Sequence, residues 1–254
     1  MLPNNELSFQ LWSAAQSSDP LATQLRTLKS CGYTDVQPYH TQYDDPQGMK
    51  RLLDEIGLTA KTGHFNVSMF EEEFDRVIAA AEVLGMNLLV APYIQPQDRP
   101  ADAGGWKRYG AVLTSYAERC AARGYTFAWH NHEFEFEALP DGSYPIEHLL
   151  GDALLWEIDV AWVVRAGVDP KPWLERYAGR IPAVHVKDIA PKQSVVTEGG
   201  WADVGEGIVD WPVLWDAAVA AGSQLMIAEH DDPSDYVRFA RTSAAAMKRL
   251  AGVA

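Results

Sequence analysis

A glycine that separates a helical segment from a β-like run recurs five times, and this repeat constrains the fold more than any other sequence feature. Helices commonly end at a residue in the left-handed backbone conformation, which glycine adopts without steric cost. A short β-like run follows the glycine at once in every case, so the chain repeats a helix-to-strand unit. The glycines are Gly32, Gly57, Gly85, Gly124 and Gly222.

Three further runs, "LSFQLW", "LLWEIDV" and "PAVHVKD", bring the number of predicted strands to eight. Between the strands, apolar residues recur at intervals of three and four, which is typical of amphipathic helices. Prolines stand where helices are expected to begin: Pro20, Pro145, Pro170, Pro212 and Pro233. The strands are predicted near residues 7–12, 34–38, 59–64, 87–91, 126–130, 154–160, 183–187 and 224–229.

Alternating strands and helices call for a parallel sheet, and eight such units in 254 residues match the size of a closed (β/α)8 TIM barrel. Residues 1–254 are expected to form a single domain, because the sequence has no linker or low-complexity stretch. An open doubly wound sheet is the main alternative. It usually has a glycine-rich phosphate turn after its first strand, and "LWSAAQSSDP" lacks one.

The charge balance restricts the partners that this chain can bind. With 21 basic and 35 acidic residues the net charge is −14, which would repel nucleic acid and anionic membranes.

The two cysteines, Cys31 and Cys120, lie in predicted helices, so a disulfide is not expected. No signal-like or membrane-spanning segment is found, and a soluble cytoplasmic protein is expected. Tryptophans in "WLERY" and "DWPVLW" make a homo-oligomer an open alternative.

Polar residues gather at the predicted carboxyl ends of the strands, where TIM barrels carry their chemistry. Glu157 and Asp159 share one face of a strand, because residues two apart point the same way. Any one such residue is more simply explained as a loop cap or a hydrogen-bonded wall residue. Imidazoles and carboxylates recurring on four strands, without thiolates, instead favour a manganese, cobalt, iron or zinc site. The four residues are His132, Asp159, His185 and Glu229.

The stretches "WHNHEFEF", "EIDVAWVVRAGVDP", "RIPAVHVKDI", "DVGEGIVDW" and "IAEHD" resemble, in this order and spacing, the xylose isomerase-like TIM-barrel superfamily. Within it they are most similar to the sugar phosphate isomerase/epimerase group, over roughly residues 5 to 250. The resemblance implies a divalent metal, often Mn²⁺, with Co²⁺, Mg²⁺, Fe²⁺ or Zn²⁺ as other options. It also implies one ligand from each of the last four strands, which places Asp159, His185 and Glu229 among the ligands.

The fifth strand departs from the pattern of the sugar epimerases. His130 stands where many of them have a metal-binding glutamate, and the H-x-H formed with His132 looks more like the inosose dehydratase branch. Trp162 occupies a position that is usually histidine in those epimerases. Strand register favours His130 as the ligand, whereas the loop position of His132 suits either a ligand or a base. Both histidines therefore stay in the expected ligand set.

A metal on a sugar carbonyl would acidify the neighbouring C–H, and a base would then remove the proton. We therefore expect a divalent-metal-dependent sugar isomerase or epimerase that acts on a keto-sugar or related polyol through a metal-stabilised enediolate. The catalytic candidates are Glu229 and His132 as bases, Lys187 as a proton donor and Glu157. A nearby cation is expected to lower the pKa of Lys187. The alternative for Lys187 is an ion pair with Glu157 or Asp188.

The substrate-binding candidates are His64, Trp12, Trp201 and Gln37. Trp201 lies in a glycine-rich loop with no helix expected to cover it, so it is predicted to close over the sugar. A neutral substrate is favoured, since no arginine lies between Arg180 and Arg238.

Three other functions are weighed against the isomerase. The first is a metal-dependent lyase or dehydratase acting on an inosose or a 3-keto-glycoside. The second is a non-catalytic sugar-binding barrel. The third, an endonuclease IV-like activity, is disfavoured by the net charge of −14.

Overall fold

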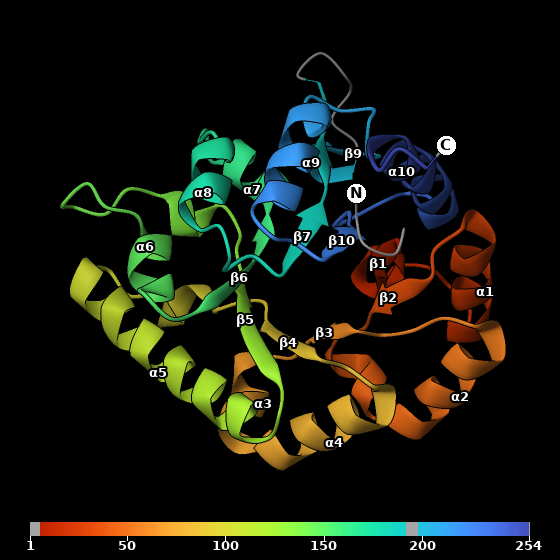
Figure 1. Ribbon diagram of the computed structural model, residues 1–254, viewed down its shortest axis with the longest axis horizontal. Helices are drawn as coiled ribbons and strands as arrows, with labels where there is room; N and C mark the ends of the chain where they lie inside the picture. Colours follow the sequence, from red (N-terminus) through yellow and green to blue (C-terminus); the bar gives the residue numbers. More distant parts are fainter. Residues whose placement is uncertain (1–5, 192–197, 254) are drawn as a thin grey trace.

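A computed structural model describes residues 6–191 and 198–253 of the chain. Eight parallel strands stand at its centre, and helices surround them (Figure 1). The strands pair in the order β2-β1-β10-β7-β6-β5-β4-β3. Their bounds are β1 Ser8–Gln10, β2 Asp35–Gln37, β3 Thr62–His64, β4 Leu88–Ala91, β5 Thr126–His130, β6 Leu155–Asp159, β7 Ala183–Val186 and β10 Leu225–Ala228.

Backbone hydrogen bonds close the barrel between β2 and β3. Val36 N donates to the carbonyl oxygen of Thr59 over 2.9 Å, and Thr59 N donates to that of Thr34 over 3.0 Å. At the other end of the seam, His64 N donates to the carbonyl oxygen of Pro38 over 2.8 Å. The predicted TIM barrel is therefore confirmed, with every predicted strand in place.

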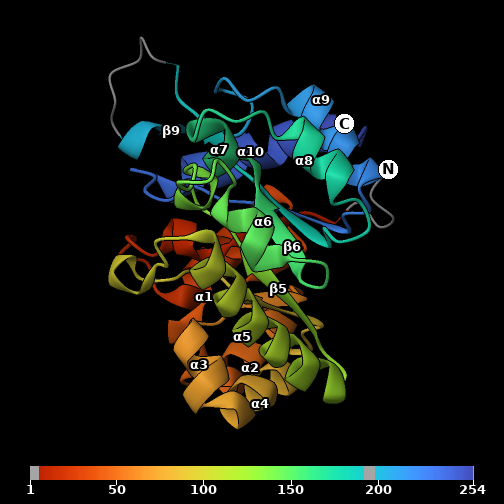
Figure 2. The same ribbon diagram turned by 90° about the vertical axis from the view of Figure 1, so that its left-hand side faces the viewer.

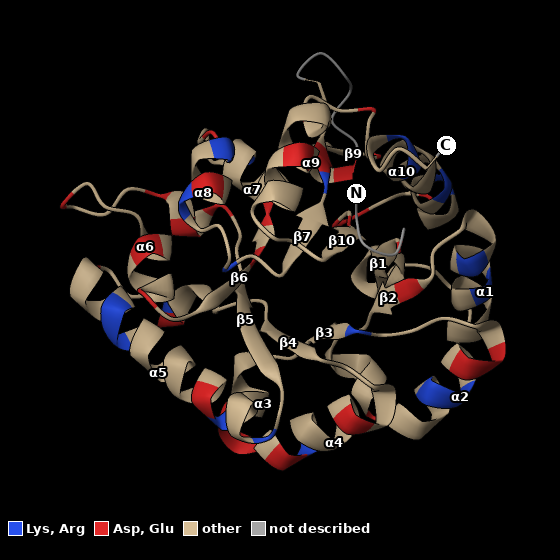
Figure 3. Ribbon diagram, in the orientation of Figure 1, with Lys and Arg blue, Asp and Glu red and all other residues tan. Residues whose placement is uncertain are grey.

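The helices form the outer ring (Figure 2), and they carry charged residues of both signs (Figure 3). Among the described residues, no helix is long and apolar enough to cross a membrane. The connection after β7 adds a small antiparallel ribbon of β8 Asp188–Ile189 and β9 Trp201–Ala202. The helices are α1 Leu21–Cys31, α2 Pro46–Ile56, α3 Val67–Glu72, α4 Phe74–Leu84, α5 Ala103–Ala122, α6 Pro145–Leu150, α7 Val160–Arg165, α8 Lys171–Arg176, α9 Trp211–Ala220 and α10 Tyr236–Leu250.

The helix ends agree with the predicted signals, with one exception. All five glycines have positive φ, for example 101° at Gly32, as the left-handed helix end requires. The helix expected at Pro233 begins instead at Tyr236. There the side chain of Asp235 accepts hydrogen bonds from two backbone N–H groups of the first turn. Asp235 therefore caps the start of the helix, and Pro233 lies outside it.

The inner face of the barrel changes from apolar to polar along β5, β7 and β10. A small apolar cluster, separate from the main core, comprises Leu88, Val90, Ala128, Ala183 and Ile227. Polar residues follow three of these positions two residues later: His130 follows Ala128, His185 follows Ala183 and Glu229 follows Ile227, and period-two geometry places each pair on the same face. The strands therefore plug one end of the barrel and present polar groups at the other.

Candidate functional site

A cavity of about 510 Å³ opens at the carboxyl ends of the strands. Its walls carry carboxamides, aromatic rings, imidazoles and two carboxylates, and none of the described residues that line it is lysine or arginine. The lining residues are Gln10, Trp12, Tyr39, His40, His64, Asn66, Pro92, Tyr93, Gln95, His130, His132, Glu229 and Asp231. This composition suits an uncharged polar molecule with an apolar face.

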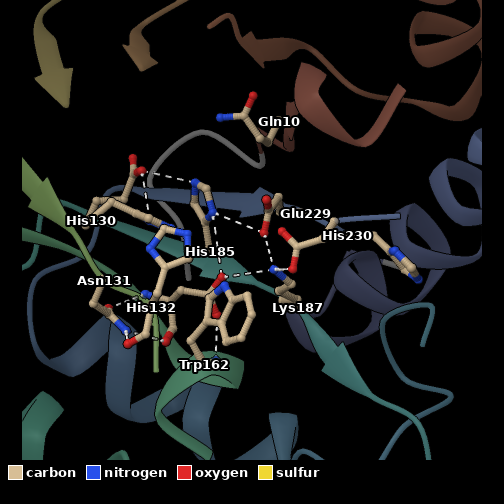
Figure 4. Close-up of polar contacts among 12 residues, drawn as sticks. Gln10, His130, Asn131, His132, Trp162, His185, Lys187, Glu229 and His230 are labelled. Atoms are coloured by element: carbon tan, nitrogen blue, oxygen red, sulfur yellow. Dashed lines mark hydrogen bonds and ion pairs between the residues drawn. The ribbon is translucent and has the colours of Figure 1, made fainter. Parts of the chain in front are cut away.

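Three side chains at this end, which we call the ligand trio, are Asp159, His185 and Glu229. His185 Nδ1 lies 3.9 Å from Asp159 Oδ2 and 3.6 Å from Glu229 Oε2. All three atoms are buried and accept no hydrogen bond from the described residues, although the Lys187 ammonium forms an ion pair with Glu229 Oε2 over 2.9 Å. Figure 4 shows His185 and Glu229 side by side above Lys187.

The donor set of the ligand trio fits a divalent metal. One imidazole nitrogen and two carboxylate oxygens lie within 4.8 Å of one another, a combination that suits Mn²⁺, Fe²⁺, Co²⁺ or Zn²⁺. Burial raises the pKa of Asp159 to about 7, although the charge of Lys187 opposes this shift. A bound cation would offset this cost of burying the carboxylate, because it favours the charged form.

Glu157 lies deeper in the barrel and already has partners for both of its oxygens. His64 Nε2 is 2.6 Å and His185 Nε2 is 3.0 Å from Glu157 Oε1, and Gln37 Nε2 donates to Oε2 over 2.7 Å. Burial acts to raise the pKa of Glu157, but the histidines hold it well below its ordinary value. Burial likewise opposes protonation of His185, yet the Glu157 carboxylate raises the pKa of that imidazole to about 10.

Lys187 is fully buried among carboxylates. Its Nζ lies 2.5 Å from Asp231 Oδ2, 2.9 Å from Glu229 Oε2 and 3.7 Å from Asp159 Oδ2. Burial acts to lower the pKa of Lys187, but in the absence of a metal these carboxylates raise it above its ordinary value. The lowering expected beside a bound cation stays a prediction. The expected alternative partners are wrong, because Asp231 takes the place of Glu157 and Asp188.

Asp188 instead shapes the connection that comes after β7. Its two carboxylate oxygens accept hydrogen bonds from the backbone N–H groups of Ile189, Gly205, Gly207 and Val209. The buried Asp188 carboxylate thus accepts the hydrogen bonds that backbone carbonyl groups would otherwise have to accept from the "DVGEG" turn beside the cavity.

The two histidines of the H-x-H motif have different surroundings, although both line the cavity. His130 Nδ1 lies 3.5 Å from Glu157 Oε1, and burial together with His185 lowers the pKa of His130 to about 3. The ring of His132 lies 5.0 Å from that of Tyr93 and 5.3 Å from that of Trp162. Burial and His130 hold the pKa of His132 well below its ordinary value, and its buried Nδ1 has no described hydrogen-bond partner.

Of the predicted substrate-binding residues, the structure places His64 and Trp12 in the cavity wall. Gln37 lies beneath the cavity, where its side-chain oxygen accepts a hydrogen bond from Gln10. Trp201 is also outside the lining, and only 4% of its surface is exposed. It packs 4.5 Å from the ring of Trp162 in α7, which corrects the expectation that no helix would cover it.

Several lining residues were missed in the sequence because they come after the strands rather than end them. Tyr93 and Gln95 come from the connection after β4, a strand whose end carries nothing ionisable. Asp231 lies two residues beyond Glu229, so the period-two rule applied past the strand end would have identified it.

Two curated relatives match most of the barrel. The rhizopine catabolism protein MocC of Rhizobium meliloti is 24% identical over 270 residues, which cover 92% of this chain and 83% of MocC. An inosose dehydratase of Lacticaseibacillus casei is 21% identical, with 80% of each chain covered.

Solved structures share the fold at low sequence identity. A sugar phosphate isomerase/epimerase from Parabacteroides distasonis is similar with a TM-score of 0.78 and 21% identity, covering 94% of this chain and 92% of that protein. The IolI protein, whose crystal structure holds a zinc atom, has a TM-score of 0.75 at 14% identity, covering 96% and 97%. Residues 25–250 match the model of one family, and the chain belongs to the xylose isomerase-like TIM barrel family.

Proposed function

We propose that this protein is a divalent-metal-dependent isomerase or epimerase of a neutral keto-sugar or related polyol. The observation that carries the proposal is the ligand trio, whose three buried donor atoms accept no hydrogen bond from the described residues and converge beside a cavity lined by carboxamides and aromatic rings. The similarity to a sugar phosphate isomerase/epimerase and to the zinc-containing IolI protein supports this choice.

In the proposed site, Asp159, His185 and Glu229 hold the cation. When bound, a divalent metal supplies Lewis acidity that polarises a sugar carbonyl and makes the neighbouring C–H more acidic. The fixed positive charge of Lys187, 2.9 Å from Glu229 Oε2, keeps that carboxylate ionised and oriented.

His132 is the proposed proton acceptor. Its low pKa keeps the imidazole neutral, and its Nδ1 has no described partner that would compete for a proton. Glu229 also lines the cavity and is the second proton-transfer group, on the side of the ligand trio. Two proton-transfer groups around one cavity are what an isomerase or epimerase needs, because a proton leaves one position and returns at another.

The cavity favours a substrate without a phosphate. Among the described residues its lining contains no cationic lysine or arginine, whereas Glu229 and Asp231 would repel an anion. Gln10, Asn66 and Gln95 offer carboxamide donors and acceptors for hydroxyl groups. Trp12, which is 42% exposed, provides an aromatic face at the rim.

A lyase is the second candidate. The inosose dehydratase of Lacticaseibacillus casei covers 80% of this chain, and loss of a β-oxygen substituent starts with the same proton removal. The two reactions diverge only after the proton has left, so one experiment separates them.

The test is incubation of the Mn²⁺-loaded protein in D₂O with a panel of keto-sugars, inososes and 3-keto-glycosides, followed by NMR. Deuterium at an intact carbon beside the carbonyl is the result expected of an isomerase or epimerase. Loss of a substituent with a new vinyl signal would identify a lyase instead. The matched protein control is His132→Gln, for which we expect a loss of at least about 100-fold in exchange rate.

Chelation separates catalysis from simple binding. We expect EDTA to abolish exchange and Mn²⁺ to restore it. A sugar that binds equally well with and without EDTA, and that never exchanges its C–H protons, would identify a non-catalytic binding barrel and refute the enzyme.

A further inference from the structure

We propose that Glu157 is a positioning residue: its carboxylate holds the Nε2 side of His185 so that Nδ1 faces the metal position of the ligand trio. This inference rests on the proposed metal site and adds a role for a residue that does not line the cavity. Glu157 was expected from the sequence to be catalytic, and its burial away from the substrate space argues for an indirect role.

The two nitrogens of His185 face different groups. Nε2 lies 3.0 Å from Glu157 Oε1 and 2.7 Å from Gln37 Oε1, whereas Nδ1 faces Asp159 and Glu229. Both oxygens near Nε2 can only accept a hydrogen bond, so the proton stays on Nε2 when the ring is neutral. The lone pair of Nδ1 is then free for a cation, as in carboxylate–histidine–metal arrangements.

The same carboxylate fixes more than one ring. His64 Nε2 lies 2.6 Å from Glu157 Oε1, and the rings of His64 and His185 are stacked with centroids 5.3 Å apart. Gln37 fixes the second oxygen and is itself fixed by Gln10, whose Nε2 donates to Gln37 Oε1 over 2.6 Å. The orientation of His185 therefore depends on a buried network that starts at β1 and β2.

The alternative is that Glu157 ligates a second metal with His64, His130 and His185, since these four also lie within 4.8 Å of one another. The hydrogen bonds argue against it. Both oxygens of Glu157 already have hydrogen-bond partners, whereas Asp159 Oδ2 and Glu229 Oε2 of the ligand trio accept no hydrogen bond from the described residues and have only the Lys187 ammonium beside them as a described ion-pair partner outside the trio. A metal fits better where donor atoms lack hydrogen-bond partners than where it would have to displace them.

The first test is calorimetric titration of metal-free protein with Mn²⁺, comparing the wild type, Glu157→Gln and Asp35→Asn. We expect the wild type to bind one equivalent and Glu157→Gln to bind it about 10 to 100 times more weakly. Asp35→Asn is the matched control, because Asp35 is a buried barrel carboxylate whose partners are Ser8, Thr59 and Lys61 rather than histidines. Its affinity should equal that of the wild type.

The outcomes distinguish the positioning role from the metal site itself. Equal affinity of Glu157→Gln and the wild type would overturn the positioning role and leave the metal site intact. If the wild type bound two equivalents of Mn²⁺ and Glu157→Gln bound only one, Glu157 would be a metal ligand. That result would also overturn the positioning role. A wild type that binds no Mn²⁺ would refute the metal site and the positioning role together.

The second test does not depend on whether Glu157→Gln folds. Long-range ¹H–¹⁵N correlation of Zn²⁺-loaded wild-type protein reports which nitrogen of His185 carries the proton, with the signal assigned by its absence in His185→Asn. We expect the proton on Nε2. A proton on Nδ1, or a metal-bound Nε2, would overturn the proposal.

Discussion

Asp35 and Glu157 are both buried carboxylates on the inner face of the barrel, yet their surroundings shift the two pKa values in opposite directions. Burial raises the pKa of Asp35 to about 6, although hydrogen bonds from Thr59 and Ser8 act to lower it. Around Glu157 the histidines outweigh burial, and the pKa falls. The neutral hydrogen-bond donors around Asp35 therefore offset only part of the free-energy cost of burying an ionised carboxylate. Around Glu157 the positive charge of imidazolium outweighs that cost.

The raised pKa of Asp35 gives a pH-dependent stability. The folded state holds this proton more tightly than the unfolded state, so the stabilisation is complete below pH 3.8 and is lost as pH rises through about 6. Between pH 5 and pH 8 we expect Asp35 to cost the wild type about 1–2 kcal/mol of unfolding free energy. Urea denaturation of wild type and Asp35→Asn at both pH values measures this cost. An identical pH dependence in the two proteins would contradict it.

The positive charge of Lys187 offsets the negative charges of three carboxylates, so its removal should lower the stability of the protein. We expect Lys187→Met to lower the unfolding free energy of metal-free protein by about 3–5 kcal/mol, because it leaves buried charge unpaired. Saturating Mn²⁺ should recover part of this loss, because a cation then faces the same carboxylates. The control is Arg26→Ala, which removes an exposed ion pair with Glu55 and should cost less than about 1 kcal/mol. A loss of similar size in both variants would contradict the compensating role.

At the scale of elements, the approach of α5 to α6 depends on a single glycine. A Cβ on Gly110 of α5 would lie 2.5 Å from the carbonyl oxygen of Leu149 and 2.9 Å from that of His148, both in α6. These contacts are with backbone atoms, so one helix would have to move to admit a methyl group. The short α6 leads directly toward β6, which carries Asp159 to the site.

We therefore expect Gly110→Ala to destabilise the protein by about 1–3 kcal/mol through overpacking. Gly104→Ala is a matched control in the same helix, where a Cβ would meet only the side chains of Arg108 and Asp102 at 3.4 Å. There alanine should be neutral or stabilise by up to about 1 kcal/mol through its helix propensity. Thermal unfolding of both variants measures the difference, and equal melting temperatures would show that the helices are not in tight contact.

At the scale of the whole molecule, a bound metal should stabilise the barrel, since it joins the ends of three strands. At about 100 times its dissociation constant, Mn²⁺ should add roughly 2.7 kcal/mol to the unfolding free energy. For a chain of this size the melting temperature should rise by about 5–10 °C. Differential scanning calorimetry with EDTA and with Mn²⁺ measures this shift. An unchanged melting temperature would contradict a site built from the native strand ends.

The barrel could be predicted from the sequence because its signals are local. A glycine at a helix end and alternation within a strand each depend on a few neighbouring residues, as Gly32 and the run Ala183, His185, Lys187 illustrate. Strand-end positions also identified the ligand trio as neighbours. The burial of Trp201 and the pairing of Lys187 with Asp231 could not be predicted in this way, since both depend on how connections fold back over the barrel.

The apolar cluster that plugs the barrel below the polar residues has a kinetic consequence. Because the interior of such a barrel is packed rather than hollow, the reactant enters and the product leaves through the same opening. The product must therefore leave through this opening before the next substrate molecule can bind. Product inhibition should accordingly be competitive with substrate.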